Sequence, residues 1–71
     1  MKRISVIVPI YNEKENIELL VEKIKTTLKD RFTSYEIILV DDGSTDGSSE
    51  LIEKIASTDP HIKDYHFTKN N

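Results

Sequence analysis

The sequence contains no cysteine and only two histidines, His61 and His66, among its 71 residues. Disulfides and thiolate zinc sites are therefore excluded, and a histidine-based metal site is disfavoured. The longest apolar runs, 6–10 and 37–40, fall far short of the ~20 residues that a membrane-spanning helix needs. Lysine and arginine form no cluster beyond the first three residues, and the net charge is -3. We expect a cytoplasmic protein with no membrane segment and no nucleic-acid partner.

Motifs for familiar chemistry are also missing. The sequence has neither the Gly-x-Gly-x-x-Gly pattern of dinucleotide-binding proteins nor a phosphate-binding P-loop. Neither histidine lies in a serine or acidic motif, so both are interpreted as surface or packed residues. At this length the chain holds one domain at most, residues 1–71, with a marginal core, because a chain of ~60 residues buries only ~60% of its surface.

The first part of the sequence has the pattern of a strand followed by a helix. Residues 4–8 are β-branched and almost continuously apolar, which suits a strand covered on both faces, and Pro9 is expected to end its pairing. Asn12 is a good N-cap for the helix, and Glu15 lies three residues further on, as in a capping box. The apolar residues with helical spacing are Ile17, Leu20, Val21, Ile24 and Leu28.

The next segments repeat this order. Residues 35–40 indicate a second buried strand, and the polar residues after it indicate a turn. A second helix is expected next, capped by Ser44 or Thr45 and ended by residues 57–60. Residues 62–68 predict a third strand. The apolar stripe of the second helix consists of Leu51, Ile52, Ile55 and Ala56.

The order β-α-β-α-β predicts an α/β fold with a parallel sheet, since such crossovers are right-handed in ~98% of cases. Tyr65 and Phe67 share one face of the third strand. Ligands of parallel sheets bind at the carboxyl ends of the strands. Polar clusters follow the first two strands, at 9–13 and 41–46. These two clusters are therefore the candidate site.

The cluster at 9–13 has two interpretations. Tyr11 can stack on a nucleoside base while Asn12 and Glu13 bind the edge of the base or its ribose. Alternatively, Asn12 only caps the helix and Tyr11 packs against it. Capping and ligand contact are compatible with each other.

The cluster at 41–46 contains three carboxylates in six positions. Turn chemistry explains the stretch from Gly43 onwards, but it explains the doubled aspartate less well. A carboxylate at the end of a parallel strand can accept a hydrogen bond from a base N–H or a ribose hydroxyl. The spacing also fits an EF-hand-like calcium loop, in which the matching residues would be Asp42, Ser44, Asp46, Gly47 and Glu53. A strand before that loop, and Ser49 at its eighth position, count against it.

The segments VIVPIYNEKENI and EIILVDDGSTDGS resemble the start of family 2 glycosyltransferases. The similarity is greatest to the branch that includes dolichyl-phosphate mannosyltransferase and bacterial polyprenyl-phosphate sugar transferases, and it covers residues 4–70. It implies the nucleotide-binding half of a GT-A-type, Rossmann-like fold. It also implies sugar transfer from a UDP- or GDP-linked donor to an acceptor such as polyprenyl phosphate, in cell-wall or glycolipid biosynthesis at the cytoplasmic face of a membrane.

The resemblance assigns the nucleotide pocket to Pro9, Tyr11 and Glu13 of the first motif and to Val40 and Asp42 of the second. The family's Mg²⁺ or Mn²⁺ is held by an Asp-x-Asp motif further along, followed by the general base. Residues 1–71 reach neither, so no catalytic residue, metal site or cofactor is predicted within them. We expect an incomplete, truncated N-terminal part that binds nucleotide weakly and transfers no sugar alone.

Two other functions stay open on the sequence. One is a small binding module that uses the calcium loop at 42–53. The other is an interaction domain that pairs an open edge of its sheet with a second chain, because exposed strand edges tend to pair.

Overall fold

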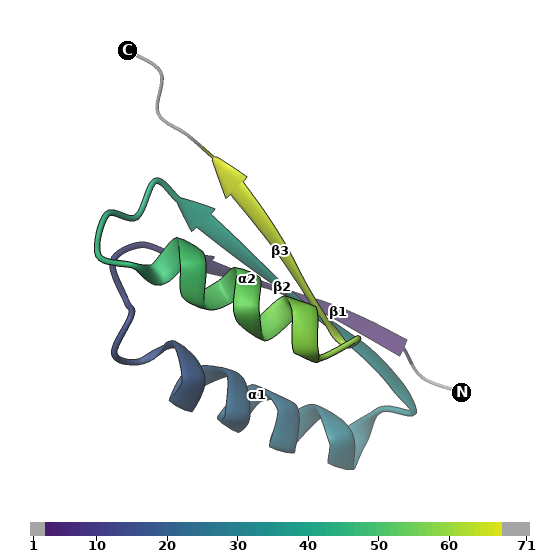
Figure 1. Cartoon of the computed structure of the whole chain (residues 1–71). Coiled ribbons are helices and arrows are strands. Elements are labelled where there is room, and N and C mark those ends of the chain that lie inside the picture. The colour runs from purple at the N-terminus through teal and green to yellow at the C-terminus, as the bar shows by residue number, and fades with distance from the viewer. Residues whose placement is uncertain (1–2, 68–71) are drawn as a thin grey trace.

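A computed structural model describes residues 3–67 as three parallel strands and two helices. The elements are β1 (Arg3–Ile10), α1 (Ile17–Arg31), β2 (Ser34–Asp42), α2 (Ser48–Thr58) and β3 (Ile62–Phe67). The sheet order is β1-β2-β3, and Figure 1 shows both helices on the same side of the sheet. Two right-handed crossovers that advance in one direction place both helices on one face. The expected α/β arrangement is confirmed.

The core lies between the sheet and the two helices. Every second side chain of a strand points to this side, and Ile37 and Leu39 of the central strand β2 are fully buried there. Each helix contributes an apolar stripe in the positions that the sequence predicts, although Leu20 of α1 remains 37% exposed. The buried apolar residues are Val8, Ile10, Ile17, Val21, Leu28, Ile37, Leu39, Ile52 and Ile62.

The other side of the sheet has no helix over it in the part of the chain that the structure describes. Ile7 of β1 is 67% exposed and Phe67 of β3 is 60% exposed. The expectation that the first strand is covered on both faces is therefore wrong for residues 3–67. We call this side the open face. Its side chains include Ser5, Ile7, Pro9, Glu36, Ile38, Val40, Asp42, Lys63, Tyr65 and Phe67.

Both of the first two strands run further than the sequence indicates. β1 continues through Pro9, which pairs with Val40, because the missing proline N–H is tolerated on an edge strand. β2 continues through Asp41 and Asp42, which the sequence places in a turn. The third strand ends at Phe67, and the last residue expected for it lies outside the described part.

The helix starts also differ from the prediction. α1 begins at Ile17, and no side chain caps it. Asn12 has a φ of 50°, in the left-handed region, and its side-chain oxygen accepts the backbone N–H of Thr45 instead. α2 has Gly47 at its N-cap, where a φ of 96° suits a residue without a Cβ. The side chains of Asn12 and Ser44 are thus used for contacts between the loops.

Two side-chain contacts lie near the amino ends of β2 and β3. Lys25 of α1 forms a 2.6 Å ion pair with Asp59, just after α2. The hydrogen bond and charge of Lys25 lower the pKa of Asp59, and the bond to Asp59 raises the pKa of Lys25. His61 stacks on Tyr35 with ring centroids 4.3 Å apart.

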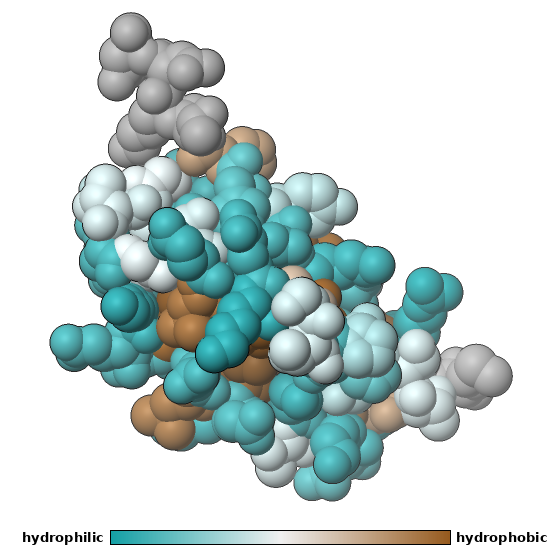
Figure 2. All heavy atoms as spheres, in the orientation of Figure 1, coloured by the Kyte–Doolittle hydropathy of each residue, from teal (hydrophilic) through white to brown (hydrophobic). Residues whose placement is uncertain are grey.

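In the orientation of Figure 1, Figure 2 shows a mostly hydrophilic surface with apolar patches between the polar side chains.

Candidate functional site

The loops after β1 and β2 are joined by hydrogen bonds. Three consecutive backbone N–H groups of the first loop donate to side-chain oxygens around the second loop. These bonds are Asn12 to Ser44 Oγ (2.9 Å), Glu13 to Ser48 Oγ (3.1 Å) and Lys14 to Asp46 Oδ2 (3.2 Å). One bond runs the other way, from the N–H of Thr45 to Asn12 Oδ1 at 2.8 Å. The two sequence motifs therefore form one structural unit.

Asp46 and Ser48 belong to the support of this unit. Asp46 Oδ1 accepts both the backbone N–H of Ser48 at 3.0 Å and its hydroxyl at 2.6 Å. The bond from the hydroxyl is the main reason that the pKa of Asp46 lies below its usual value. Ser48 is fully buried beneath the loops. These residues explain why the second motif is rich in turn-type side chains.

The two adjacent aspartates have different surroundings. Asp41 is buried on the helix side, where Oδ1 accepts the N–H of Ser44 at 2.9 Å and Oδ2 lies 3.3 Å from His66 Nδ1. Burial opposes its ionisation, but hydrogen bonds from Ser44, His66 and Ser49 outweigh burial and lower the pKa of Asp41. Asp42 is exposed and, one residue along the strand, points to the open face. Only Asp42 is accessible to a ligand.

Three of the five predicted nucleotide-binding residues meet on the open face. Pro9 pairs with Val40 across the two strands, and Asp42 lies two residues beyond Val40 on the same face. Sequence reasoning gave no role to the aromatic residues of the neighbouring strand. The register places Tyr65 beside Val40 and Phe67 beside Asp42, so two exposed rings lie next to the predicted residues. The sequence showed that Tyr65 and Phe67 share one face of their strand, but only the strand register shows which residues of β2 lie beside them.

The other two predicted residues lie in the first loop. Tyr11 directly follows β1 and is 53% exposed. Glu13 Oε2 accepts a 3.4 Å hydrogen bond from the side chain of Asn16, and the Glu13 N–H bonds to Ser48. Both partners of Glu13 are at helix starts. The structure therefore places Glu13 toward the helices and does not bring it together with the open-face group.

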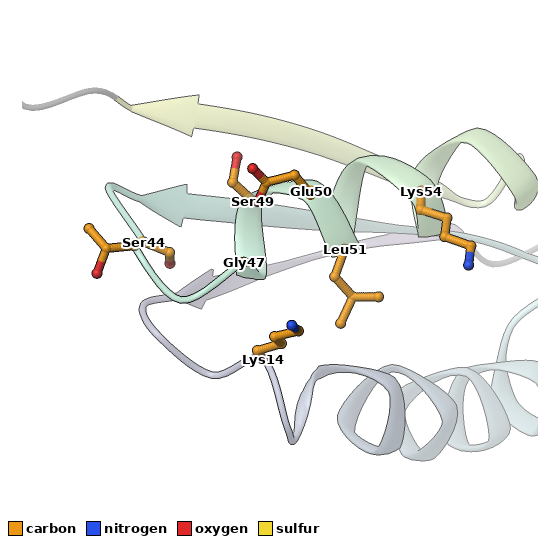
Figure 3. A pocket seen from close by; sticks show the side chains of 8 residues that line it. Lys14, Ser44, Gly47, Ser49, Glu50, Leu51 and Lys54 are labelled. Carbon is orange, nitrogen blue, oxygen red and sulfur yellow. The ribbon is translucent and has the colours of Figure 1, made fainter.

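A surface hollow with a volume of about 870 Å³ lies between the first loop and α2 (Figure 3). In that view, the side chain of Leu51 extends toward Lys14. A Cβ added to Gly47 would lie 3.2 Å from Lys14 Nζ, so a larger residue there would displace the lysine side chain. None of the five predicted residues lines the hollow. It also has no aromatic side chain on which a base could stack, and we place the candidate site on the open face instead.

His66 lies among carboxylates that come from three different elements. Its Nδ1 is 3.0 Å from Ser49 Oγ and 3.3 Å from Asp41 Oδ2. Its Nε2 is 2.9 Å from Asp64 Oδ2 and 3.5 Å from Glu53 Oε2. Burial disfavours the charged ring, but the bonds to Asp64 and Asp41 outweigh burial and raise the pKa of His66. Sequence reasoning missed this group, because only Asp64, two residues away on the same strand, is near in sequence.

The calcium loop permitted by the spacing is not assembled. The segment before Asp42 is a strand rather than a helix. Asp46 binds Ser48, and Glu53 faces His66. Among residues 3–67, the group that brings three potential ligand side chains together is Glu53, Asp64 and His66, which includes neither of the aspartates expected in that loop.

The family model described as glycosyl transferase family 2 matches residues 5–71. The chain belongs to this family. The resemblance found in the two motifs is thereby confirmed, and the three parallel strands with two helices agree with part of a Rossmann-like GT-A fold.

Relatives with curated names place the chain near one branch of the family. The undecaprenyl-phosphate 4-deoxy-4-formamido-L-arabinose transferase of Photorhabdus laumondii is 46% identical over 63 residues, which are 87% of this chain and 19% of that protein. The protein of the same name from Yersinia enterocolitica is 44% identical over 57 residues, 80% of this chain and 17% of its own length. The chain thus spans less than a fifth of these relatives. Similarity to the polyprenyl-phosphate sugar transferase branch is confirmed.

Neither helix of the described residues is long and apolar enough to cross a membrane.

Proposed function

We propose that this chain forms the nucleotide-binding part of the donor site of a sugar transferase. The observation that carries the proposal is the meeting of Pro9, Val40 and Asp42 on one face, at the carboxyl ends of two neighbouring parallel strands. Parallel sheets bind ligands at that end. Membership of glycosyl transferase family 2 supplies the class of reaction. The donor is a UDP- or GDP-linked sugar.

Each residue of this group has a role that its chemistry allows. The exposed carboxylate of Asp42 accepts a hydrogen bond from a base N–H or a ribose hydroxyl, and such charge-assisted bonds are strong. Pro9 and Val40 form an apolar floor beneath the base. Tyr11 supplies a ring for stacking. Glu13 is assigned to the pocket by family resemblance alone, because its contacts in the structure are with Asn16 and Ser48.

The leaving diphosphate needs a counter-charge, which metal ions or cationic side chains supply. The doubled aspartate does not fit a metal here, because Asp41 is buried and bonded to Ser44 and His66. We propose that a Mg²⁺ or Mn²⁺ ion used in transfer is held by residues other than the doubled aspartate and that these 71 residues alone transfer no sugar.

The names of the relatives suggest the acceptor. We propose a polyprenyl phosphate, used at the cytoplasmic face of a membrane in the synthesis of a cell-wall component or glycolipid. The relatives in question are named for undecaprenyl phosphate.

Calorimetric titration with UDP and with GDP tests the donor site. Asp42→Asn is expected to weaken binding about tenfold or more, since a hydrogen bond to a charged group contributes roughly 1.5–3 kcal/mol. Tyr11→Ala is expected to have a similar effect, because stacking of a base on an aromatic ring contributes about 1–3 kcal/mol. Asp30→Asn is the matched control, because Asp30 is exposed on α1, away from both loops. Equal affinity in all four proteins would reject this site.

Incubation of the purified chain with UDP- and GDP-linked sugars and a polyprenyl phosphate tests the second part of the proposal. No glycolipid product is expected. Product formation would show that residues 1–71 contain the whole catalytic machinery.

A second candidate function is self-association through the sheet. β1 and β3 are edge strands in the described part of the chain, and open edges pair readily with another strand. We propose a second copy of this chain as the partner. Sedimentation velocity would show a dimer that dissociates on dilution, and a monomer at all concentrations would contradict this candidate.

A further inference from the structure

We propose that Glu53, Asp64 and His66 form a binding site for a divalent transition-metal cation of the Zn²⁺ type. One potential ligand atom of each residue lies within 4.8 Å of the other two. Glu53 comes from α2, and the other two come from β3, so the site would bridge a helix and the sheet. None of the three belongs to the motifs at 9–13 and 41–46. The site therefore goes beyond the proposed donor function.

The two separations from the imidazole nitrogen to the carboxylates fit a coordination shell. Ligand atoms about 2.1 Å from a metal are about 3.0 Å apart at a right angle and about 3.4 Å apart at the tetrahedral angle. His66 Nε2 lies 2.9 Å from Asp64 Oδ2 and 3.5 Å from Glu53 Oε2. The first distance is close to the separation at a right angle, and the second is close to the separation at the tetrahedral angle. Glu53 is 60% exposed, so its carboxylate can rotate toward the cation and water can complete the shell.

The other nitrogen of the ring is held as it is in known metal sites. Metal-binding histidines usually give their second N–H to a carboxylate, which fixes the tautomer and orients the ring. His66 Nδ1 faces the buried carboxylate of Asp41 at 3.3 Å, and Ser49 Oγ lies 3.0 Å away. In the protonated ring, Nε2–H fills the position between the carboxylates and lies 2.9 Å from Asp64 Oδ2. In the neutral ring with Nδ1–H donating to Asp41, the Nε2 lone pair points toward Asp64 and Glu53, and a metal cation can take the place of that proton.

The negative charge around the His66 ring also favours a bound cation. Three carboxylates surround one imidazole: Asp41, Glu53 and Asp64. Two negative charges stay uncompensated even when the ring is protonated. The lysine ion pairs found in residues 3–67 are Lys25 with Asp59 and Lys63 with Glu36, and neither includes these carboxylates. A divalent cation that replaces the ring proton would lower this repulsion.

The donor set selects the kind of cation. Imidazole nitrogen suits Zn²⁺, Co²⁺ and Ni²⁺, whereas Mg²⁺ and Ca²⁺ prefer shells of oxygen atoms. One nitrogen and two carboxylate oxygens leave open positions for water. We therefore expect strong preference for Zn²⁺ over Mg²⁺.

Calorimetric titration of the 71-residue chain with Zn²⁺ at neutral pH tests the site. One ion is expected to bind per chain, and the same concentration of Mg²⁺ is expected to give no heat. His66→Gln should abolish binding. His61→Gln is the matched control, because His61 stacks on Tyr35 and is not part of the group, and it should bind as the unchanged chain does. Asp41→Asn should weaken binding roughly 10–100-fold through loss of ring orientation.

A measurement on the unchanged chain guards against variants that fail to fold. Long-range ¹⁵N NMR reports each imidazole nitrogen, and Zn²⁺ should shift the Nε2 resonance of His66 while leaving His61 in place. No Zn²⁺ heat, equal loss in both histidine variants, or a shift confined to His61 would overturn the proposal. The proposal would also be overturned if the chain stayed unfolded with Zn²⁺ bound, because the ligands reach one another only when α2 and β3 are folded together. Nucleotide binding is not part of this readout, so failure here leaves the donor site untouched.

Discussion

The two faces of the sheet carry different kinds of residues. The helix-covered face holds the buried apolar core and the buried Asp41. The open face holds Pro9, Val40 and Asp42 at the carboxyl ends of the strands, with Tyr65 and Phe67 beside them. One residue along β2 is enough to move from one face to the other. The doubled aspartate therefore contains one structural and one ligand-accessible carboxylate.

The two motif loops show a similar division. Backbone N–H groups of the first loop are bound by side chains of Ser44, Asp46 and Ser48. The polar side chains of the second motif are thus used mainly to shape the site. This leaves Tyr11, from the first motif, and Asp42, from the strand end, as the exposed residues best placed to meet a ligand.

The largest expected difference between the faces is in core packing. Ile37→Ala should lower the free energy of unfolding by about 2–5 kcal/mol, because Ile37 is fully buried and its loss leaves a cavity. Ile7→Ala removes an exposed side chain from the open face and should cost less than about 1 kcal/mol. Urea denaturation measures both. Equal losses would show that the open face is covered in solution.

The adjacent aspartates give the next largest difference. Asp41→Asn should destabilise the fold by about 1–3 kcal/mol, because it disturbs the buried acceptor of the Ser44 N–H and the contact with His66. Asp42→Asn should change stability by less than about 0.5 kcal/mol, as exposed substitutions usually do. Thermal unfolding followed by circular dichroism compares the two. A larger loss in Asp42→Asn would reverse the assignment of the aspartates.

The smallest expected difference is between two ion pairs. Lys25 with Asp59, on the helix side, is short and partly buried, whereas Lys63 with Glu36, on the open face, is 4.0 Å long and more exposed. Lys25→Met should cost about 1 kcal/mol and Lys63→Met close to zero, since exposed pairs contribute little.

The Lys25–Asp59 pair should also respond to acid. The folded-state pKa of Asp59 lies below its usual 3.8, so its contribution to stability is present above that value. The contribution is lost as the pH falls through the lowered pKa. The stability gap between the unchanged chain and Asp59→Asn should therefore be constant near neutral pH and should close below about pH 4. A gap that instead closes near pH 7 would mean that another group is responsible.

Much of the fold could be predicted from periodicity. Val21 and Leu28 recur with helical spacing and are buried in α1, and Ile37 and Leu39 are buried in a strand as expected. The extent of β1 was underestimated because Pro9 breaks pairing only where its N–H is needed, and β1 is an edge strand.

The site was harder to predict, because its contacts cross from one segment to another. The sequence could place Pro9 and Val40 at strand ends, but their pairing depends on register. Asn12 was expected at a helix start because asparagine caps helices, whereas its side chain bonds to Thr45, 33 residues away. The partners of His66 on α2 and β2 could not be found for the same reason. Local spacing carries no information on such distant contacts.

The central claim is that a nucleotide binds on the open face, at the carboxyl ends of β1 and β2. Titration of the ¹⁵N-labelled chain with UDP and GDP, followed by NMR, tests it most directly. The account predicts that one of these nucleotides shifts the backbone resonances of Tyr11, Val40 and Asp42, while resonances in the middle of α1 stay unchanged. Shifts confined to the hollow around Lys14, Gly47 and Leu51, or no shifts with either nucleotide, would contradict it.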